Sequence, residues 1–240
     1  MRCLFVILAA LLGPLVREVN ANLYGSANSL HEIDPTTGDP TLIGNTGFGV
    51  FGLAYDSTTN TLFGSANSLF DVSTETGSAI TIGSTGHSIL GLAFDSGTGT
   101  LYGSANSLYA IDTVTGAATS IGSTGHTVFG LAFDPATDTM YGSANSLFTI
   151  DRDTGAAIPI GATGTLIHGL AFDSVTNTLF GVGASQLFTL DTATGAATPV
   201  GSTEVIVRGL AYMAVPEPGT GILMGLGLLA LGVRPRRWIL

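Results

Sequence analysis

A repeat of fixed length constrains this chain more than any other feature. The six residues GSANSL begin at Gly25 and return unchanged at Gly64, Gly103 and Gly142, always 39 positions apart. The hydrophobic residue at the start of the LYG run recurs five times with the same spacing, at Leu23, Leu62, Leu101, Met140 and Leu179. A period near 40 residues is typical of a propeller or a solenoid, in which each unit buries its apolar surface against the next.

Each unit contains four short strand-like runs separated by turn residues. In the third unit these runs are residues 100–105, 107–112, 117–122 and 128–134. Four strands in a unit of this length predict one blade of a β-propeller.

The residues within each run predict its place in the blade. The third run contains Pro40, Pro159 and Pro199, and proline lacks the amide that an interior strand uses, so this run is expected at the exposed edge. The GLAF run has small residues that suit the crowded innermost strand. The expected order from the axis outward is therefore GLAF, LYG, SLF and AT-IG.

The array begins with a second strand at Leu23 and ends with an innermost strand at residues 209–212. We therefore predict an all-β body over residues 22–214, a five-bladed propeller closed by strand exchange between its termini, which ties the termini together and removes a free sheet edge. The alternative is an open β-solenoid, which needs capping units that the sequence does not supply.

Three kinds of turn are predicted within the repeats. Asn in the GSANS hairpin is expected to adopt a left-handed conformation, at positions 28, 67, 106 and 145. Asp opens the turns that begin at positions 34, 112, 151 and 191, with Ser73 in its place in the second unit, and Gly closes them with positive φ. Further turns open with Asp56, Asp95, Asp134 and Asp173, and their fifth residue tolerates positive φ. These acids are interpreted as turn caps, not as catalysts.

The repeats resemble the short LYxID-TGAAT-IG-GLAFDP propeller repeats of secreted bacterial proteins, over residues 23–212. The resemblance implies the fold and little about activity.

The first 21 residues have the pattern of a secretory signal peptide. Arg2 precedes an apolar run over residues 4–12, a Gly-Pro break follows, and Val19-Asn20-Ala21 offers a cleavage site after Ala21. We expect a signal helix that signal peptidase removes. An N-terminal membrane anchor is the alternative, but about 20 apolar residues are usual for a span.

The last 26 residues, 215–240, combine three elements in a fixed order: Pro216-Glu217-Pro218, an apolar stretch over residues 221–233, and the cluster Arg234, Arg236 and Arg237. This arrangement resembles the PEP-CTERM sorting signal of Gram-negative bacteria. The resemblance implies a transient helix in the inner membrane with the body facing the periplasm, cleavage by an exosortase near the Pro-Glu-Pro motif, and release to the cell surface or extracellular matrix. The apolar stretch is short and Trp238-Ile239-Leu240 follows the arginines, so a permanent anchor is the alternative.

Charge and cysteine content exclude several classes of partner. Between the two terminal segments fifteen acids face only two basic residues, Arg152 and Arg208, so a nucleic-acid backbone would be repelled. The one cysteine, Cys3, lies outside the body, which therefore has no disulfide or cysteine metal site. No cofactor is expected.

The candidate site lies where the GSANS hairpins and the loops into the next innermost strand share one face. That face is expected to carry the tentative ligand-binding residues Asn67, Asn106, Asn145, His87, His126, His168 and Arg208. Their amide and imidazole groups could bind sugar hydroxyls, with Tyr24, Tyr102 or Tyr141 as stacking surfaces, but turn formation and blade packing account for the same residues. No metal-ligand cluster is expected, because the repeated acids belong to the opposite turns.

The sequence favours a non-enzymatic surface or matrix protein, with exopolysaccharide as its ligand. The alternative is a carbohydrate-active enzyme on a propeller scaffold. A glycosidase or lyase needs dissimilar acids placed asymmetrically, whereas Glu32, Glu75 and Glu204 break the repeat without forming a recognisable pair.

Overall fold

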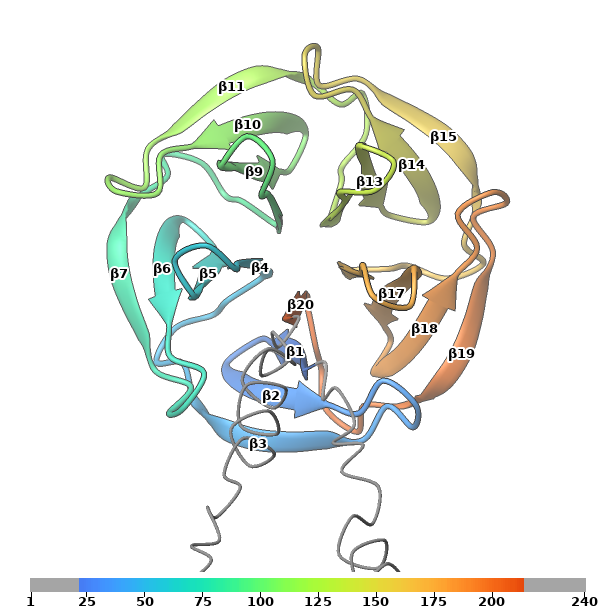
Figure 1. Cartoon of the computed structure of the whole chain (residues 1–240), viewed down its shortest axis with the longest axis horizontal. Coiled ribbons are helices and arrows are strands. Elements are labelled where there is room, and N and C mark those ends of the chain that lie inside the picture. Colours follow the sequence, from blue (N-terminus) through green and yellow to red (C-terminus); the bar gives the residue numbers. More distant parts are fainter. Residues whose placement is uncertain (1–21, 214–240) are drawn as a thin grey trace, which may run out of the picture. The chain divides into compact units, whose positions relative to one another are not determined.

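The computed structural model describes residues 22–213, which form a ring of five four-stranded antiparallel sheets (Figure 1). The predicted all-β, five-bladed propeller is therefore confirmed. The signal helix and the C-terminal apolar helix fall on residues outside the described range. Among the described residues, no helix is long and apolar enough to cross a membrane.

Each blade contains strands at four equivalent positions. The innermost strands are β4 (Gly52–Asp56), β8 (Gly91–Asp95), β12 (Gly130–Asp134), β16 (Gly169–Asp173) and β20 (Gly209–Met213). The second strands are β1 (Asn22–Ser26), β5 (Thr61–Ser65), β9 (Thr100–Ser104), β13 (Thr139–Ser143) and β17 (Thr178–Gly183). The third strands are β2 (Ser29–Ile33), β6 (Ser68–Val72), β10 (Ser107–Ile111), β14 (Ser146–Ile150) and β18 (Gln186–Leu190). The outermost strands are β3 (Pro40–Asn45), β7 (Ala79–Ser84), β11 (Ala118–Ser123), β15 (Ala157–Ala162) and β19 (Ala197–Ser202).

This order from the axis outward is the one that the proline and glycine positions predict. Blade 1 consists of β20, β1, β2 and β3, and blades 2 to 5 follow in chain order from β4 to β19. The last strand of the body therefore completes the first blade, as predicted, and the open solenoid is excluded.

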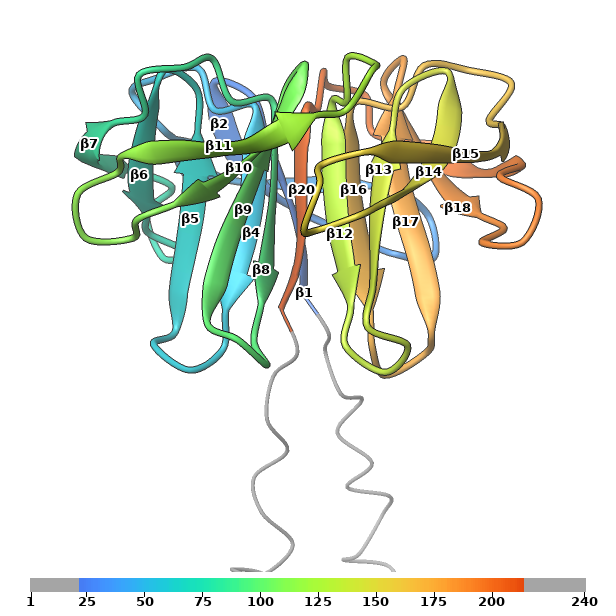
Figure 2. The ribbon, with the colours of Figure 1, turned by 90° about the horizontal axis from the view of Figure 1, so that it is seen from above.

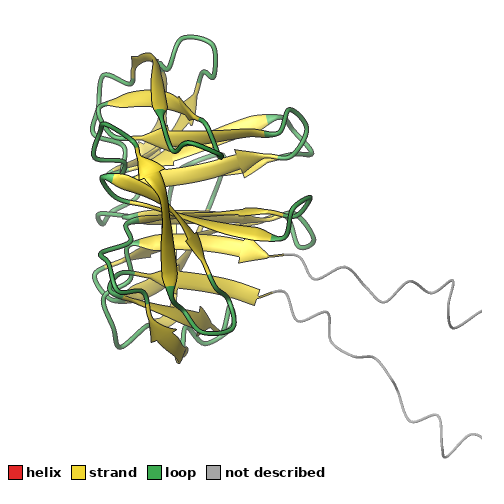
Figure 3. Ribbon diagram, turned by 90° about the vertical axis from the view of Figure 1, so that its left-hand side faces the viewer, coloured by secondary structure: helices red, strands yellow, loops and turns green. Residues whose placement is uncertain are grey.

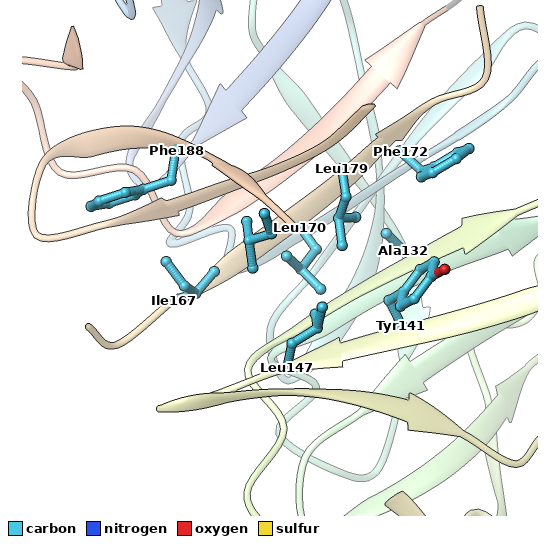
Figure 4. Packing of buried hydrophobic residues seen from close by; sticks show 9 residues of the cluster. Ala132, Tyr141, Leu147, Ile167, Leu170, Phe172, Leu179 and Phe188 are labelled. Carbon is cyan, nitrogen blue, oxygen red and sulfur yellow. The ribbon is translucent and has the colours of Figure 1, made fainter. Parts of the chain in front are cut away.

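The core lies between neighbouring blades. Between blades 4 and 5, Leu147 and Tyr141 pack against Ile167, Leu170 and Phe188 of the next blade (Figure 4). Leu147 and Ile167 are fully buried, and equivalent clusters fill the other junctions. The ring is therefore held together mainly by apolar burial between blades.

Outermost strands also touch the next blade through glycine. A Cβ at Gly83 of blade 2 would lie 2.0 Å from the carbonyl oxygen of Thr115 of blade 3, a distance that no side chain allows. The same contact repeats around the ring, so the blades meet backbone to backbone at their outer edge.

Most of the predicted turn chemistry is present. The Asp34 carboxylate accepts the amide proton of Thr36 at 2.7 Å, and Gly38, which closes that turn, has a φ of 82°. In the turns between the first two strands, φ is positive at Asn60, Asp138 and Asn177. The Asp residues therefore cap turns, as their spacing indicates.

The prediction for the hairpin Asn residues is wrong. Among the described non-glycine residues, positive φ occurs at six positions, and Asn28, Asn67, Asn106 and Asn145 are not among them. The hairpins instead are tied to the neighbouring loop: the amide of Thr124 donates to the carbonyl oxygen of Asn106 at 3.2 Å, and that of Val128 to Ala105 at 2.8 Å. Because these bonds hold the hairpin from outside, it does not require the left-handed turn.

The two faces of the ring differ in their turns. One face, which we call the hairpin face, carries the hairpins between second and third strands and the loops that lead from each blade to the next. The other, the Asp-turn face, carries the Asp-capped turns. The start of β1 and the end of β20 lie at the Asp-turn face (Figures 2 and 3). At these ends Asn22 and Met213 are register partners.

Candidate functional site

The contacts of the GSANS hairpin explain its residue types. A Cβ at Gly103 would clash with Ile111 and Ile89, at 2.6 and 2.8 Å. The buried hydroxyl of Ser104 donates to the carbonyl oxygen of Val128 at 3.2 Å. This bond ties the second strand of blade 3 to the loop that leads into blade 4. Gly and Ser are therefore required for packing, whereas the exposed Asn106 side chain is left at the surface.

Three predicted ligand-binding residues, Asn67, Asn106 and Asn145, occupy equivalent exposed positions on the hairpin face. Their backbone carbonyls bind the loops, a role that any residue can fill. The Asn106 side chain also accepts a hydrogen bond from the Thr127 hydroxyl at 2.7 Å. The structure thus places these amides on one face, each on a separate blade.

The histidines of the GSTGH segments cover blade junctions. The His87 ring lies 4.6 Å from the ring of Tyr109 in the next blade, and His126 lies 4.9 Å from Phe148. Phe48 and Phe70 make the same contact one junction earlier, at 4.9 Å. The exposed imidazoles are therefore held in place by stacking, but His87 and His126 belong to different junctions.

His168 and Arg208 lie closer to the axis, in the residues just before the innermost strands. Their position is shared by Phe51, Leu90 and Phe129. All of these except Arg208 line a space at the axis, together with the glycines that begin the innermost strands. The Arg208 guanidinium lies over the Phe51 ring, 5.3 Å from its centre, and His168 contacts Phe129 edge-on at 5.6 Å. The space at the axis is too small to hold a water molecule, so the axis is closed here.

Burial lowers the pKa of His168, and the positive charge of Arg208 lowers it further. His168 is therefore neutral at pH 7. Of the predicted site residues, His168 and Arg208 are the two that the structure brings into electrostatic contact.

Tyr24, Tyr102 and Tyr141 are buried, with exposed fractions between 4% and 9%. They pack between blades, so the interpretation of these residues as blade packing is confirmed and they offer no stacking surface.

A cavity of ≈ 570 Å³ on blade 1 is not among the sites predicted from the sequence. It is lined by Ala27, Asn28, Ser29, His31, Leu42, Phe51, Val205, Ile206 and Arg208. Burial lowers the pKa of His31, partly opposed by a hydrogen bond with the backbone of Ser29. The signal that could have located the cavity is the loss of the repeat pattern at positions 31, 205 and 208.

Charge is distributed unequally between the two faces. The hairpins and loops of the hairpin face contain a single acid among the described residues, Glu204. On the Asp-turn face Arg152 bridges two blades, with nitrogen–oxygen distances of 2.6 Å to Asp95 and 2.5 Å to Asp138. No group of three or more His, Cys, Asp or Glu side chains within residues 22–213 is arranged to hold a metal ion.

Comparison with known proteins identifies a sorting motif in the chain. The family model of the PEP-CTERM protein-sorting motif matches residues 214–237. The chain carries a PEP-CTERM sorting motif. This confirms the resemblance based on Pro216, Glu217, Pro218 and the three arginines 234, 236 and 237. The PEP-CTERM motif implies an exported protein, a C-terminus held transiently in a membrane, and processing by an exosortase.

The body of this PEP-CTERM chain is similar in fold to a chain in the crystal structure of a nidogen/laminin complex. The TM-score is 0.58 and the identity 14%, over 81% of this chain and 98% of that one. At this identity the similarity concerns the fold alone. A search of the curated proteins found no sequence match.

Proposed function

We propose that this exported PEP-CTERM propeller is a non-enzymatic binding protein of the cell surface or extracellular matrix, with polysaccharide as its ligand. Residues 1–21 act as the signal peptide, and an exosortase cuts near Pro216-Glu217-Pro218 to release the body. The observation that carries the binding role is the repetition of exposed amide and imidazole groups at equivalent positions of one face.

The geometry of His87 and His126 favours binding over packing alone. Each imidazole packs against an aromatic ring of the next blade, with the two ring planes tilted by 33°, but is itself exposed. Its ring nitrogens can therefore donate to or accept from a hydroxyl group without a change of rotamer. Because such sites repeat from blade to blade, a polymer can occupy several of them and gain affinity through multivalency.

The proposal excludes an active site on the hairpin face. A glycosidase needs two carboxyl groups about 5–10 Å apart, one on each side of the scissile bond. Glu204 is the one acidic residue in the described loops of this face. Repeated, near-identical sites also suit binding of a repetitive ligand better than a single reaction centre.

The test is a titration of soluble polysaccharides into the purified body, residues 22–214, followed by calorimetry. We expect saturable binding of a polymer and much weaker binding of its monosaccharide. The double variant His87→Ala/His126→Ala should lose about tenfold or more in affinity for the polymer, because two of the repeated contacts are removed. Phe48→His, which places a third imidazole opposite Phe70, should raise affinity.

Two results would contradict the proposal. Equal affinity of wild type and the double variant would remove the histidines from the site. Turnover of a polysaccharide with one dominant site would favour the enzyme instead.

The sorting step has its own test, mass spectrometry of the exported protein. We expect the mature form to lack residues 221–240. An intact C-terminus on the secreted protein would contradict cleavage by an exosortase. In the membrane-held form, an intact C-terminus would favour a permanent anchor.

A further inference from the structure

The junction that closes the ring differs from the others on the hairpin face. At three junctions an aromatic or imidazole ring of the loop stacks on the third strand of the next blade, as in the pairs Phe48–Phe70, His87–Tyr109 and His126–Phe148. At the fourth, Thr165 takes the loop position opposite Phe188. At the closing junction, the equivalent residues are Val205 and His31, so the ring of the loop is absent and the ring of the strand is the smaller imidazole.

The cavity lies where this stack is absent. Both Val205 and His31 line it, and its volume of ≈ 570 Å³ falls within the usual range for small-molecule sites. The space is therefore a consequence of two substitutions in an otherwise repeated contact.

The walls of the cavity divide into an apolar and a polar part. The large hydrophobic residues Leu42 and Ile206 line it, with exposed fractions of 64% and 66%. Asn28, His31 and Arg208 provide hydrogen-bonding groups. A ligand that fits this division has an apolar ring or face and a polar group that faces the arginine.

Arg208 determines the charge of that polar group. It is one of two basic residues between residues 22 and 213, and in this part of the chain the other, Arg152, forms both salt bridges on the opposite face. Arg208 makes no salt bridge with a described residue. Its guanidinium is oriented by the Phe51 ring, 5.3 Å below it, and its amide donates to the carbonyl oxygen of Ser26 at 2.8 Å. An oriented guanidinium without a carboxylate partner suits bidentate binding of an anion.

The distribution of acids supports an anionic ligand despite the negative body. Apart from Glu204, the described loops and hairpins around the cavity contain no acid, whereas the capping Asp residues lie on the other face. The repulsion expected from the net charge is thus weaker on this face than on the Asp-turn face.

We propose that the cavity of blade 1 is a single binding site for a carboxylate attached to a ring, with Arg208 holding the carboxylate and Leu42 and Ile206 covering the ring. This chemistry is shared by uronic-acid units of polysaccharides and by free aromatic acids. The site is distinct from the repeated hairpin sites, since it occurs on one blade only.

The test uses two probes, galacturonate and benzoate, and two controls, galactose and acetate, titrated into the body and followed by calorimetry and by NMR of the Arg208 side chain. We expect a stoichiometry of one for at least one ring carboxylate, and binding about tenfold or more weaker for galactose and acetate. Binding of galacturonate indicates an acidic sugar as the natural source, and binding of benzoate alone indicates a free aromatic acid.

Two variants separate the site from the fold. Arg208→Gln should weaken the binding of the ring carboxylate about tenfold or more. The double variant His31→Tyr/Val205→His rebuilds the stack seen between His87 and Tyr109, so it should fold normally and abolish binding by filling the cavity.

A matched control is Phe48→Val/Phe70→His, which opens an equivalent space where Phe51 stands in place of Arg208. It should leave affinity for the probes unchanged. The proposal is overturned if neither ring carboxylate binds, if Arg208→Gln binds as well as wild type, or if the filled variant still binds. None of these outcomes bears on the multivalent polymer binding at His87 and His126, which the filled variant retains.

Discussion

Leu23, in the second strand of blade 1, is the register partner of Tyr212, in the last strand of the body. These residues belong to opposite ends of the chain, and the five register pairs between β1 and β20 close the ring. Without β20, both β1 and the innermost strands β4 and β16 lose a neighbour. The closure thus depends on five residues.

We therefore expect a truncation that ends at Arg208 to aggregate or to melt far below the complete body, because it exposes a sheet edge and part of the core. The control is a chain that ends at Ala214, which should unfold cooperatively. Thermal unfolding followed by circular dichroism compares them, and identical melting curves would show that the exchange is dispensable.

Gly83→Ala and Gly125→Ala test the backbone contact between blades. Gly83→Ala should destabilise the body by about 3 kcal/mol or prevent folding, since the added Cβ meets the Thr115 carbonyl oxygen at 2.0 Å. Gly125 has a φ of 72° with nothing within 4 Å of the added Cβ, so Gly125→Ala should cost only about 1 kcal/mol of backbone strain. Urea unfolding gives both values, and equal losses would mean that the outer contact yields easily.

Arg152 should stabilise the pairing of blades 3 and 4. Its partner Asp95 is nearly fully buried, and the guanidinium also lies 5.0 Å from the centre of the Phe133 ring. Arg152→Ala should lower the free energy of unfolding by about 1–2 kcal/mol. The loss is limited to this range because the buried Asp95 carboxylate keeps its hydrogen bonds from Gly97 and Thr98.

Asp138→Asn is the matched control for Arg152→Ala, and it should cost less than 1 kcal/mol because Asp138 is 74% exposed. Comparable losses in the two variants would contradict a special role for the buried pair.

His168 provides a prediction about pH. Burial and the charge of Arg208 lower its pKa in the folded state, so the folded protein binds its proton less readily than the unfolded chain. Its contribution to stability is therefore complete above the unfolded pKa of about 6.5 and is lost as the pH falls through the folded pKa. The melting temperature of His168→Phe should depend less on pH between 7 and 5 than that of wild type.

Arg208→Gln should raise the pKa of His168 toward its ordinary value, because one of the two causes of the shift is removed. NMR titration of the imidazole measures it directly. A pKa that does not move would leave burial as the sole cause.

Much of the fold could be predicted because the same residue pattern occurs in several units of the repeat. Proline in the third run marks the outer edge in three blades, and a single misreading would conflict with the others. The exchange of strands followed from the phase of the array, which begins with a second strand and ends with an innermost one.

The hairpin conformation could not be predicted because its cause lies outside the hairpin. The amide of Thr124 and the hydroxyl of Ser104 hold loop and hairpin together, and these contacts appear only once the blade is assembled. Local turn propensity therefore gave the wrong backbone for Asn106.

The cavity of blade 1 was missed for a related reason. His31 and Val205 are unremarkable as single residues and lie far apart in the chain. Their significance depends on the stack that other junctions form in their place, such as His126 on Phe148. A space between residues is not encoded by any motif, but a break in a repeat can indicate where to look for one.

Because Asn22 and Met213 are adjacent, the order of the strands along the chain could be permuted. A short linker between these neighbours would make the ring continuous, and the chain could then be opened at another Asp-capped turn, such as that between β10 and β11. The same ring, with the same inter-blade contacts, would then begin and end in a different blade. Such a circular permutant would still contain His31, Val205 and Arg208 side by side, since their position is set by the ring and not by where translation starts.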